Sequence, residues 1–191
     1  MNIEPTDALV VVDVQVDFCP GGALAVAGGH EIVPGINRLI PRFAHCAFTR
    51  DWHPPDHCSF SDSPQFVDGS WPAHCVQGTP GAAFHPDLAL PPDAWIVDKA
   101  TDSDREAYGG FDNPSFASDL RGRGVKRLFV CGIATDYCVK ATAMGGVAHG
   151  FHVVLLHDLC RGVNVPPGSA AEAVNTMKHA GVHVIDSEEL R

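Results

Sequence analysis

The sequence predicts an α/β fold, a three-layer α/β/α sandwich around a six-stranded, mostly parallel sheet. Two observations support this prediction. Short apolar, β-branched segments alternate with longer helical stretches along the whole chain, and such alternation builds parallel sheets with right-handed crossovers. Several of these segments, for example 8–12, are continuously apolar, as expected for strands that are buried on both faces.

The elements follow in order along the chain. Strands are predicted at 8–12, 44–49, 94–97, 127–132, 152–156 and 182–185. Helices are predicted between them at 31–43, 115–122, 136–149 and 169–180. The last helix begins with Ser169 and has Glu172 three residues later, a capping-box pattern, and Gly181 is a plausible end signal.

One segment, about 51–92, interrupts this alternation. It is rich in Pro, Gly, Asp, Ser and His, and an insertion of this length in a compact domain is usually functional. The chain has 191 residues, a length typical of one domain. We therefore expect a single domain over 1–191 that carries one long working loop.

Charge and cysteine content limit the functions that the protein can have. The net charge is −10, which disfavours binding to nucleic acid or to an anionic membrane because both require a basic face. The seven cysteines form no CxxC motif, and the first residues lack a basic leader followed by an apolar stretch. We expect a protein of the reducing cytoplasm that acts on a small molecule.

Residues capable of chemistry follow four consecutive predicted strands: Asp13, Asp51 with His53, Lys99 and Cys138. In an open parallel sheet, ligands bind at the carboxyl ends of the strands. The sequence therefore predicts that these side chains meet at one edge of the sheet.

Cys138, Asp13 and Lys99 form a candidate nucleophilic set. Cys138 is predicted in the first turn of a helix, where the helix N-terminus and a nearby lysine would lower the pKa of its thiol. Asp13 follows an apolar strand, so burial would raise its pKa and suit it to proton transfer. Two alternatives are a cysteine that only fills the core and an Asp–Lys ion pair that is only structural; the coincidence of all three residues favours catalysis.

Asp51, His53 and His74 form a candidate metal site. Residues i and i+2 of an extended segment point the same way, so Asp51 and His53 can reach one ion, and His74 completes the set. Two imidazoles and one carboxylate suit Zn²⁺, Fe²⁺ or Mn²⁺ and leave positions open for substrate or water. His57 is a further candidate ligand, but the spacing alone does not place it in the ligand set.

Five segments together resemble the nicotinamidase/pyrazinamidase family of the isochorismatase-like cysteine hydrolases: 12–18 (VDVQVDF), 51–54 (DWHP), 71–79 (WPAHCVQGT), 99–102 (KATD) and 132–142 (GIATDYCVKAT). The resemblance runs from about residue 7 to residue 187. It implies hydrolysis of nicotinamide to nicotinate and ammonia, a step of NAD salvage. By matched position it implies a catalytic triad of Asp13, Lys99 and Cys138.

The same resemblance assigns further residues. Asp51, His53 and His74 match the ligands of one divalent metal ion, most simply Zn²⁺, that holds the pyridine nitrogen of the substrate. Phe18, Trp71 and Tyr108 match aromatic pocket walls, and Ala134 matches a substrate-binding position that follows a cis peptide bond at 133–134. Ala100, where relatives often have Gly, and Tyr137, where some have His, depart from the pattern.

Other functions remain open from the sequence. The chain could be another amidase of the superfamily that acts on a maleamate, N-carbamoyl or ureido compound. It could also be a direct metallohydrolase in which Cys138 is structural, or a non-catalytic ligand-binding module. The native metal, the preference between nicotinamide and pyrazinamide, and the formation of homo-oligomers are not decided by the residues.

Overall fold

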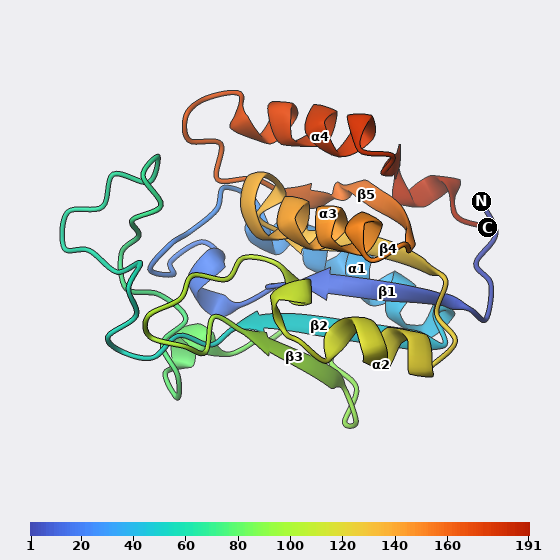
Figure 1. Ribbon diagram of the computed structural model, residues 1–191, viewed down its shortest axis with the longest axis horizontal. Coiled ribbons are helices and arrows are strands. Elements are labelled where there is room, and N and C mark those ends of the chain that lie inside the picture. Colours follow the sequence, from blue (N-terminus) through green and yellow to red (C-terminus); the bar gives the residue numbers. More distant parts are fainter.

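Six parallel strands form the sheet at the centre of the protein (Figure 1). The computed structural model describes residues 1–191. The strands lie in the order β3-β2-β1-β4-β5-β6, and every neighbouring pair is parallel. They are β1 (Asp7–Val12), β2 (His45–Asp51), β3 (Trp95–Lys99), β4 (Arg127–Ile133), β5 (His152–Arg161) and β6 (His183–Ile185).

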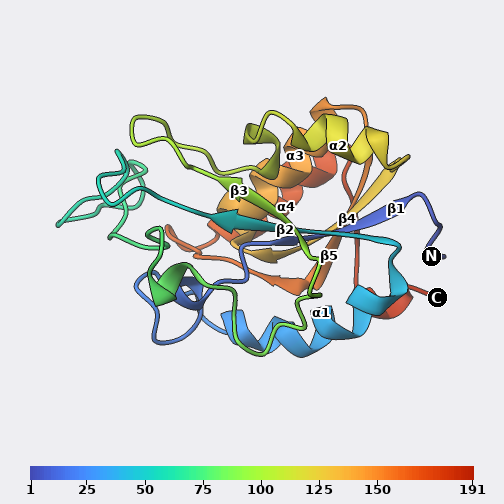
Figure 2. The same ribbon diagram turned by 90° about the horizontal axis from the view of Figure 1, so that it is seen from below.

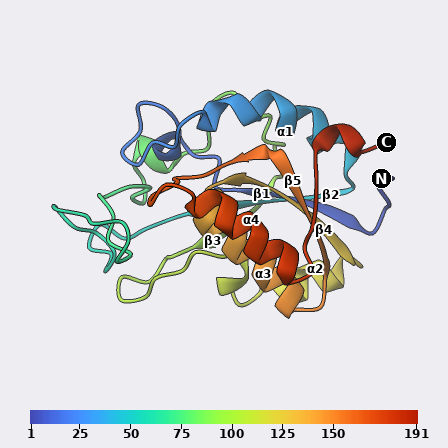
Figure 3. The same cartoon turned by 90° about the horizontal axis from the view of Figure 1, so that it is seen from above.

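Helices cover both faces of this sheet, so the predicted three-layer α/β/α fold is confirmed. α1 (Val33–Leu39) lies on one face, and α2 (Phe116–Gly122), α3 (Lys140–Ala148) and α4 (Ser169–His179) lie on the other (Figures 2 and 3). The two chain ends meet, and the Arg191 N–H donates to the Met1 carbonyl. None of the helices combines the length and apolar character that a membrane-spanning segment requires.

The predicted helix at 31–43 is divided into three parts. A 3-10 turn (Gly29–Ile32) precedes α1, and a second one (Ile40–Arg42) follows it. The second turn contains Pro41, which has no N–H to donate and clashes with the preceding helical turn. The α-helix therefore ends at Leu39.

The predicted capping box at Ser169 is wrong. The N-cap of α4 is Gly168, in the left-handed conformation, and no side chain caps the helix. The Ser169 hydroxyl instead donates to Asp136 at 2.6 Å, so a tertiary acceptor replaces the local one. The other end agrees with the sequence: Gly181 has φ 97° and follows the last turn of α4.

β1 lies at the centre of the sheet and is shielded on both sides. Its residues Ala8–Val12 are fully buried, as their continuous apolar pattern predicts. At its carboxyl end Val12 pairs with Gly132 of β4. Gly132 has φ 124°, and a Cβ there would lie 2.1 Å from the Val12 carbonyl oxygen, so only glycine allows β4 to approach so closely. One residue further on, the Ile133–Ala134 peptide bond is cis, as the resemblance implies.

We predict that Gly132→Ala lowers the free energy of unfolding by about 3 kcal/mol or more, because it combines a backbone clash with an unfavourable φ. Gly122→Ala in α2 is the matched control, since a Cβ there meets nothing within 4 Å and should change stability by less than about 1 kcal/mol. Urea denaturation of the three proteins measures both effects. Equal stability of Gly132→Ala and the parent would contradict the close approach.

Candidate active site

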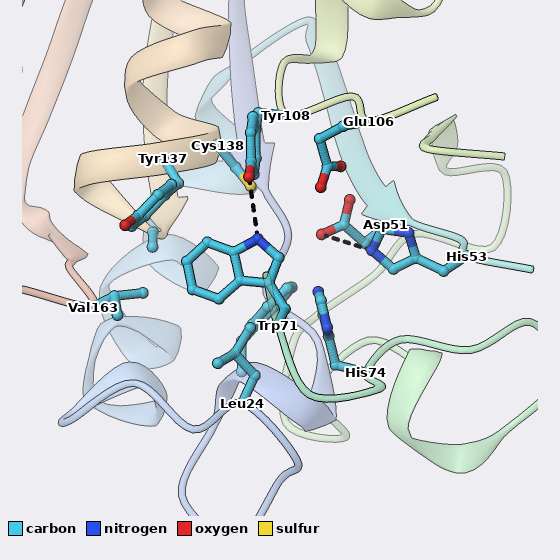
Figure 4. Close-up of a pocket in the computed structure, with 12 residues that line it drawn as sticks. Leu24, Asp51, His53, Trp71, His74, Glu106, Tyr108, Tyr137, Cys138 and Val163 are labelled. Carbon is cyan, nitrogen blue, oxygen red and sulfur yellow. Dashed lines mark hydrogen bonds and ion pairs between the residues drawn. The ribbon is translucent and has the colours of Figure 1, made fainter. Parts of the chain in front are cut away.

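The carboxyl edge of the sheet brings the candidate residues together, as predicted. Asp13 follows β1, Asp51 and Lys99 are paired at the ends of β2 and β3, and Cys138 follows β4. His53 and His74 come from the long loop after β2. Figure 4 shows Asp51, His53, His74 and Cys138 around one pocket.

Lys99 is the centre of this group. Its ammonium lies 2.9 Å from Asp13 Oδ2 and 3.5 Å from Cys138 Sγ, and it also pairs with Asp51. Its side chain is fully buried. Burial by itself would lower the pKa of Lys99, but the two carboxylates outweigh it and hold the pKa well above its ordinary value. Lys99 is therefore a fixed positive charge beside the thiol.

Asp13 is held in an unusual backbone conformation, with φ 48°. Its Oδ1 accepts a hydrogen bond from the Thr49 hydroxyl at 2.6 Å. Burial raises the pKa of Asp13 to about 6, although Lys99 opposes this shift. A buried carboxylate with a pKa near neutrality can both take and return a proton.

Cys138 lies on a π-helical turn (Thr135–Val139) that precedes α3, and not in the first turn of the α-helix itself. Burial raises the pKa of its thiol well above the usual value, and Lys99 offsets this only in part. The expectation of a lowered thiol pKa is therefore wrong, because desolvation of the thiolate outweighs the lysine. A protonated thiol requires a base, and ligand atoms of Asp13, Asp51 and Cys138 all lie within 4.8 Å of one another.

Asp51, His53 and His74 form a cluster that fits a divalent metal ion. Their ligand atoms lie within 4.8 Å of one another. Both ring nitrogens of His53 are buried without a hydrogen-bond partner. His74 Nδ1 donates to the Pro72 carbonyl at 2.8 Å, which leaves Nε2 free to coordinate, as is usual for histidine ligands. Burial lowers the pKa of His74 to about 4, so the ring is neutral.

His57 lies beside this cluster but does not complete it. Its ring centroid is 4.3 Å from that of His53. However, His57 Nδ1 bonds to the Ser59 hydroxyl at 2.8 Å and Nε2 to the Arg105 carbonyl at 3.2 Å. Because both of its ring nitrogens are hydrogen-bonded, His57 stabilises the loop and has no free nitrogen with which to bind an ion.

The pocket between Cys138 and the histidines has an empty volume of about 380 Å³, its open mouth included. The aromatic and apolar residues expected from the resemblance all line it: Phe18, Trp71, Tyr108 and Ala134. The indole N–H of Trp71 donates to the Tyr108 hydroxyl at 3.1 Å, and this bond fixes the two rings relative to each other.

Sequence reasoning missed three residues that line the pocket, Leu24, Glu106 and Val163, and named Tyr137 only as a departure from the family pattern. Tyr137 precedes the nucleophile candidate and Glu106 precedes Tyr108 by two residues, so their positions carried a signal. Leu24 and Val163 carry no local signal, because only the fold brings their loops to the site.

Two buried polar residues that sequence reasoning also missed hold the site in place. Gln15 accepts the Asp51 N–H and donates to the carbonyls of Asp51 and Ala82. Asp136 accepts the N–H groups of Val163 and Asn164 and the Ser169 hydroxyl. These bonds fix Asp51 on one side of the pocket and the wall at Val163 on the other.

Ala100 has φ 52°, a left-handed conformation that glycine adopts more readily. The resemblance implies glycine at this position, and the observed conformation is one that favours glycine. The substitution leaves Lys99 within reach of both Asp13 and Asp51.

A parallel sheet flanked by helices, with a buried Cys–Lys–Asp set beside a His–His–Asp cluster, is the arrangement of an α/β-fold enzyme with a candidate cysteine nucleophile. Comparison with known families gives a narrower assignment: the isochorismatase domain family matches residues 7–189. The chain belongs to the isochorismatase family.

Individual relatives are similar over nearly their whole length. The nicotinamidase/pyrazinamidase of Mycobacterium tuberculosis is 40% identical, over 94% of this chain and 98% of its own. The structure of Pyrococcus horikoshii pyrazinamidase in complex with zinc matches with a TM-score of 0.86 and 47% identity, over 95% and 99% of the two chains. PnC1 from L. infantum in complex with nicotinate matches with a TM-score of 0.88 and 38% identity, over 98% and 96%.

The different hydrogen bonding of His74 and His57 gives a direct test of the metal cluster. We predict that His74→Ala lowers the affinity for Zn²⁺ by more than the roughly 10–100-fold typical of an outer-shell partner, because it removes a ligand. His57→Ala removes a neighbouring imidazole of the same loop and should cost less than that. Titration of each purified protein against a competing chelator measures the affinities. Equal losses in the two variants would place His57 in the ligand set.

Proposed function

We propose that this protein is a nicotinamidase, which hydrolyses nicotinamide, and pyrazinamide as well, to the acid and ammonia through a cysteine thioester. The reaction belongs to NAD salvage. One observation carries the proposal: Cys138, with the buried Lys99 and Asp13 behind it, lines the same small pocket as the Asp51–His53–His74 cluster. The names and near-complete coverage of the relatives support it.

The first step forms a bond between sulfur and carbon. Asp13 takes the proton of the Cys138 thiol, and Lys99 stabilises the negative sulfur as the proton leaves. The sulfur attacks the carboxamide carbon, and the electrons of the C=O bond move to oxygen. The N–H groups of Ala134 and Cys138 donate to this oxyanion; the loss of one such donor costs about 10²–10³ in rate in other enzymes.

The next steps release the two products. Asp13 returns the proton to the amide nitrogen, the C–N bond breaks, and ammonia leaves a thioester on Cys138. Asp13 then takes a proton from a water molecule as the water oxygen attacks the thioester carbon. The C–S bond breaks, Asp13 returns the proton to the sulfur and so regenerates the thiol, and the acid leaves. The pKa of Asp13, raised to about 6 by burial, suits this repeated exchange of one proton.

Asp51, His53 and His74 would hold one divalent ion, and the two imidazoles with one carboxylate suit Zn²⁺, with Fe²⁺ or Mn²⁺ as alternatives. When bound, the ion would supply a Lewis acid able to coordinate the pyridine nitrogen and so orient the substrate. The rings of Phe18, Trp71 and Tyr108 give the flat substrate its apolar walls. All seven cysteines are free, which fits a single-domain protein of the reducing cytoplasm.

The test of this proposal is ammonia release from nicotinamide by the purified protein supplied with metal. We predict turnover by the parent and a loss of about 10⁴-fold or more in Cys138→Ala, since the removal of a nucleophile disables the whole triad. Cys58→Ala is the matched control, because Cys58 is an exposed cysteine of the loop that does not line the pocket.

Two results would contradict the proposal. Appreciable turnover by Cys138→Ala would indicate direct metal-dependent hydrolysis. Turnover of open-chain amides but not of nicotinamide would indicate another amidase of the same family.

A further inference from the structure

Glu106 places a carboxylate on the wall of the pocket. The residue lies in the segment between β3 and α2, is half-buried, and lines the pocket together with Asp51, Tyr108 and Cys138. Figure 4 shows its carboxylate pointing into the pocket on the side of Asp51. The proton transfers described above do not use it.

This carboxylate differs from the other two at the site because no cation neutralises it. Asp13 and Asp51 share the ammonium of Lys99, whereas Glu106 forms no ion pair. Its Oε1 accepts only the N–H of the adjacent Ala107, at 2.9 Å. The charge acts inside the pocket: burial raises the pKa of Tyr108, and the Glu106 carboxylate adds to that shift.

An unpaired negative charge at this position affects the binding of the substrate amide and of the product acid differently. The amide is neutral, whereas the acid formed from it is an anion at neutral pH. A unit charge in a half-buried, largely apolar pocket repels an anion more strongly than it would in water. It repels the neutral amide little, and a carboxylate oxygen can accept hydrogen bonds from amide N–H groups.

The other charges of the site favour binding of the anionic acid over the neutral amide. A residue that weakens binding of the acid would therefore affect product release. One carboxylate and two neutral imidazoles around a divalent ion would leave the cluster with a net positive charge. Lys99 is a further cation beside the nucleophile, and Asp13 offsets its charge, so the site with a bound divalent ion would keep a net positive charge. Without a compensating negative charge, the anionic product would be retained where it forms.

We propose that Glu106 is a specificity-determining residue that weakens binding of the anionic acid relative to the neutral carboxamide, and so promotes product release. The inference rests on the proposed function, because it concerns the substrate and product of that reaction. The repelled ligands form a chemical class, the aromatic carboxylates.

The test measures equilibrium binding of nicotinamide and nicotinate to the metal-loaded protein by calorimetry, in a Cys138→Ala background that prevents turnover. Adding Glu106→Gln should tighten nicotinate binding by roughly 5–10-fold at low salt, with less effect at high salt. Nicotinamide affinity should change by less than about twofold, since the amide carries no charge.

Two matched variants separate this role from a structural one. Glu106→Asp keeps the charge and should keep most of the preference for the amide. Asp104→Asn removes one charge from an exposed position of the same segment outside the pocket, so it should leave both affinities unchanged. In the enzyme with Cys138 intact, Glu106→Gln should lower the inhibition constant of nicotinate more than the KM for nicotinamide.

Unchanged nicotinate affinity in Glu106→Gln, or an equal change for both ligands, would overturn the assignment. The same loss of preference in Asp104→Asn would also overturn it, because the effect would then arise from overall charge. If the parent releases ammonia from nicotinamide while Glu106→Gln shows no selective effect, only this inference fails. If the parent does not act on nicotinamide, the proposed function fails and this inference fails with it.

Discussion

The site depends on the ion pairs that the buried ammonium of Lys99 forms with Asp13 and Asp51. Removing a charge from water costs several kcal/mol even after relaxation, and only the carboxylates of Asp13 and Asp51 compensate for it here. These three residues stand at the ends of three adjacent strands, so the register of β1, β2 and β3 determines whether the charges meet. The loss of Lys99 would leave two buried carboxylates without their cation, and the loss of either carboxylate would leave Lys99 with one partner instead of two. The same ammonium faces Cys138, and Asp51 belongs to the metal cluster, so Lys99 connects the nucleophile to the metal ligands.

Burial determines the protonation states of the groups around Lys99. It raises the pKa of the Cys138 thiol and of the Asp13 carboxyl, and it lowers the pKa of His74. The resting site therefore holds a thiol rather than a thiolate, a carboxylate able to take its proton, and a neutral imidazole able to bind metal. Gln15 and Asp136 hold Asp51 and the pocket wall at Val163 in position through bonds to the backbone. Dry surroundings and fixed dipoles of this kind are what charge development in a transition state requires.

Much of the fold and of the site could be predicted from the sequence, because parallel strands buried on both faces form continuous apolar segments that the sequence shows directly. The residue after each strand then indicates what reaches the edge of the sheet, which is how Asp13, Lys99 and Cys138 were found. Features set by tertiary partners could not be predicted. Ser169 bonds to Asp136 and not to its own helix, and the desolvation of Cys138 depends on its final burial. Gln15 acts through Asp51 and Ala82, which are distant in sequence, and nothing local reveals its role.

The central claim is that the carboxamide carbon becomes bonded to Cys138 before water reaches it. Turnover of nicotinamide in the presence of hydroxylamine tests this claim most directly, because hydroxylamine competes with water for a thioester. A thioester intermediate should give nicotinohydroxamate as a product, in a proportion that rises with hydroxylamine concentration, while the rate of ammonia release does not fall. Formation of nicotinate alone, at every hydroxylamine concentration, would contradict a thioester and favour direct attack of water on the amide.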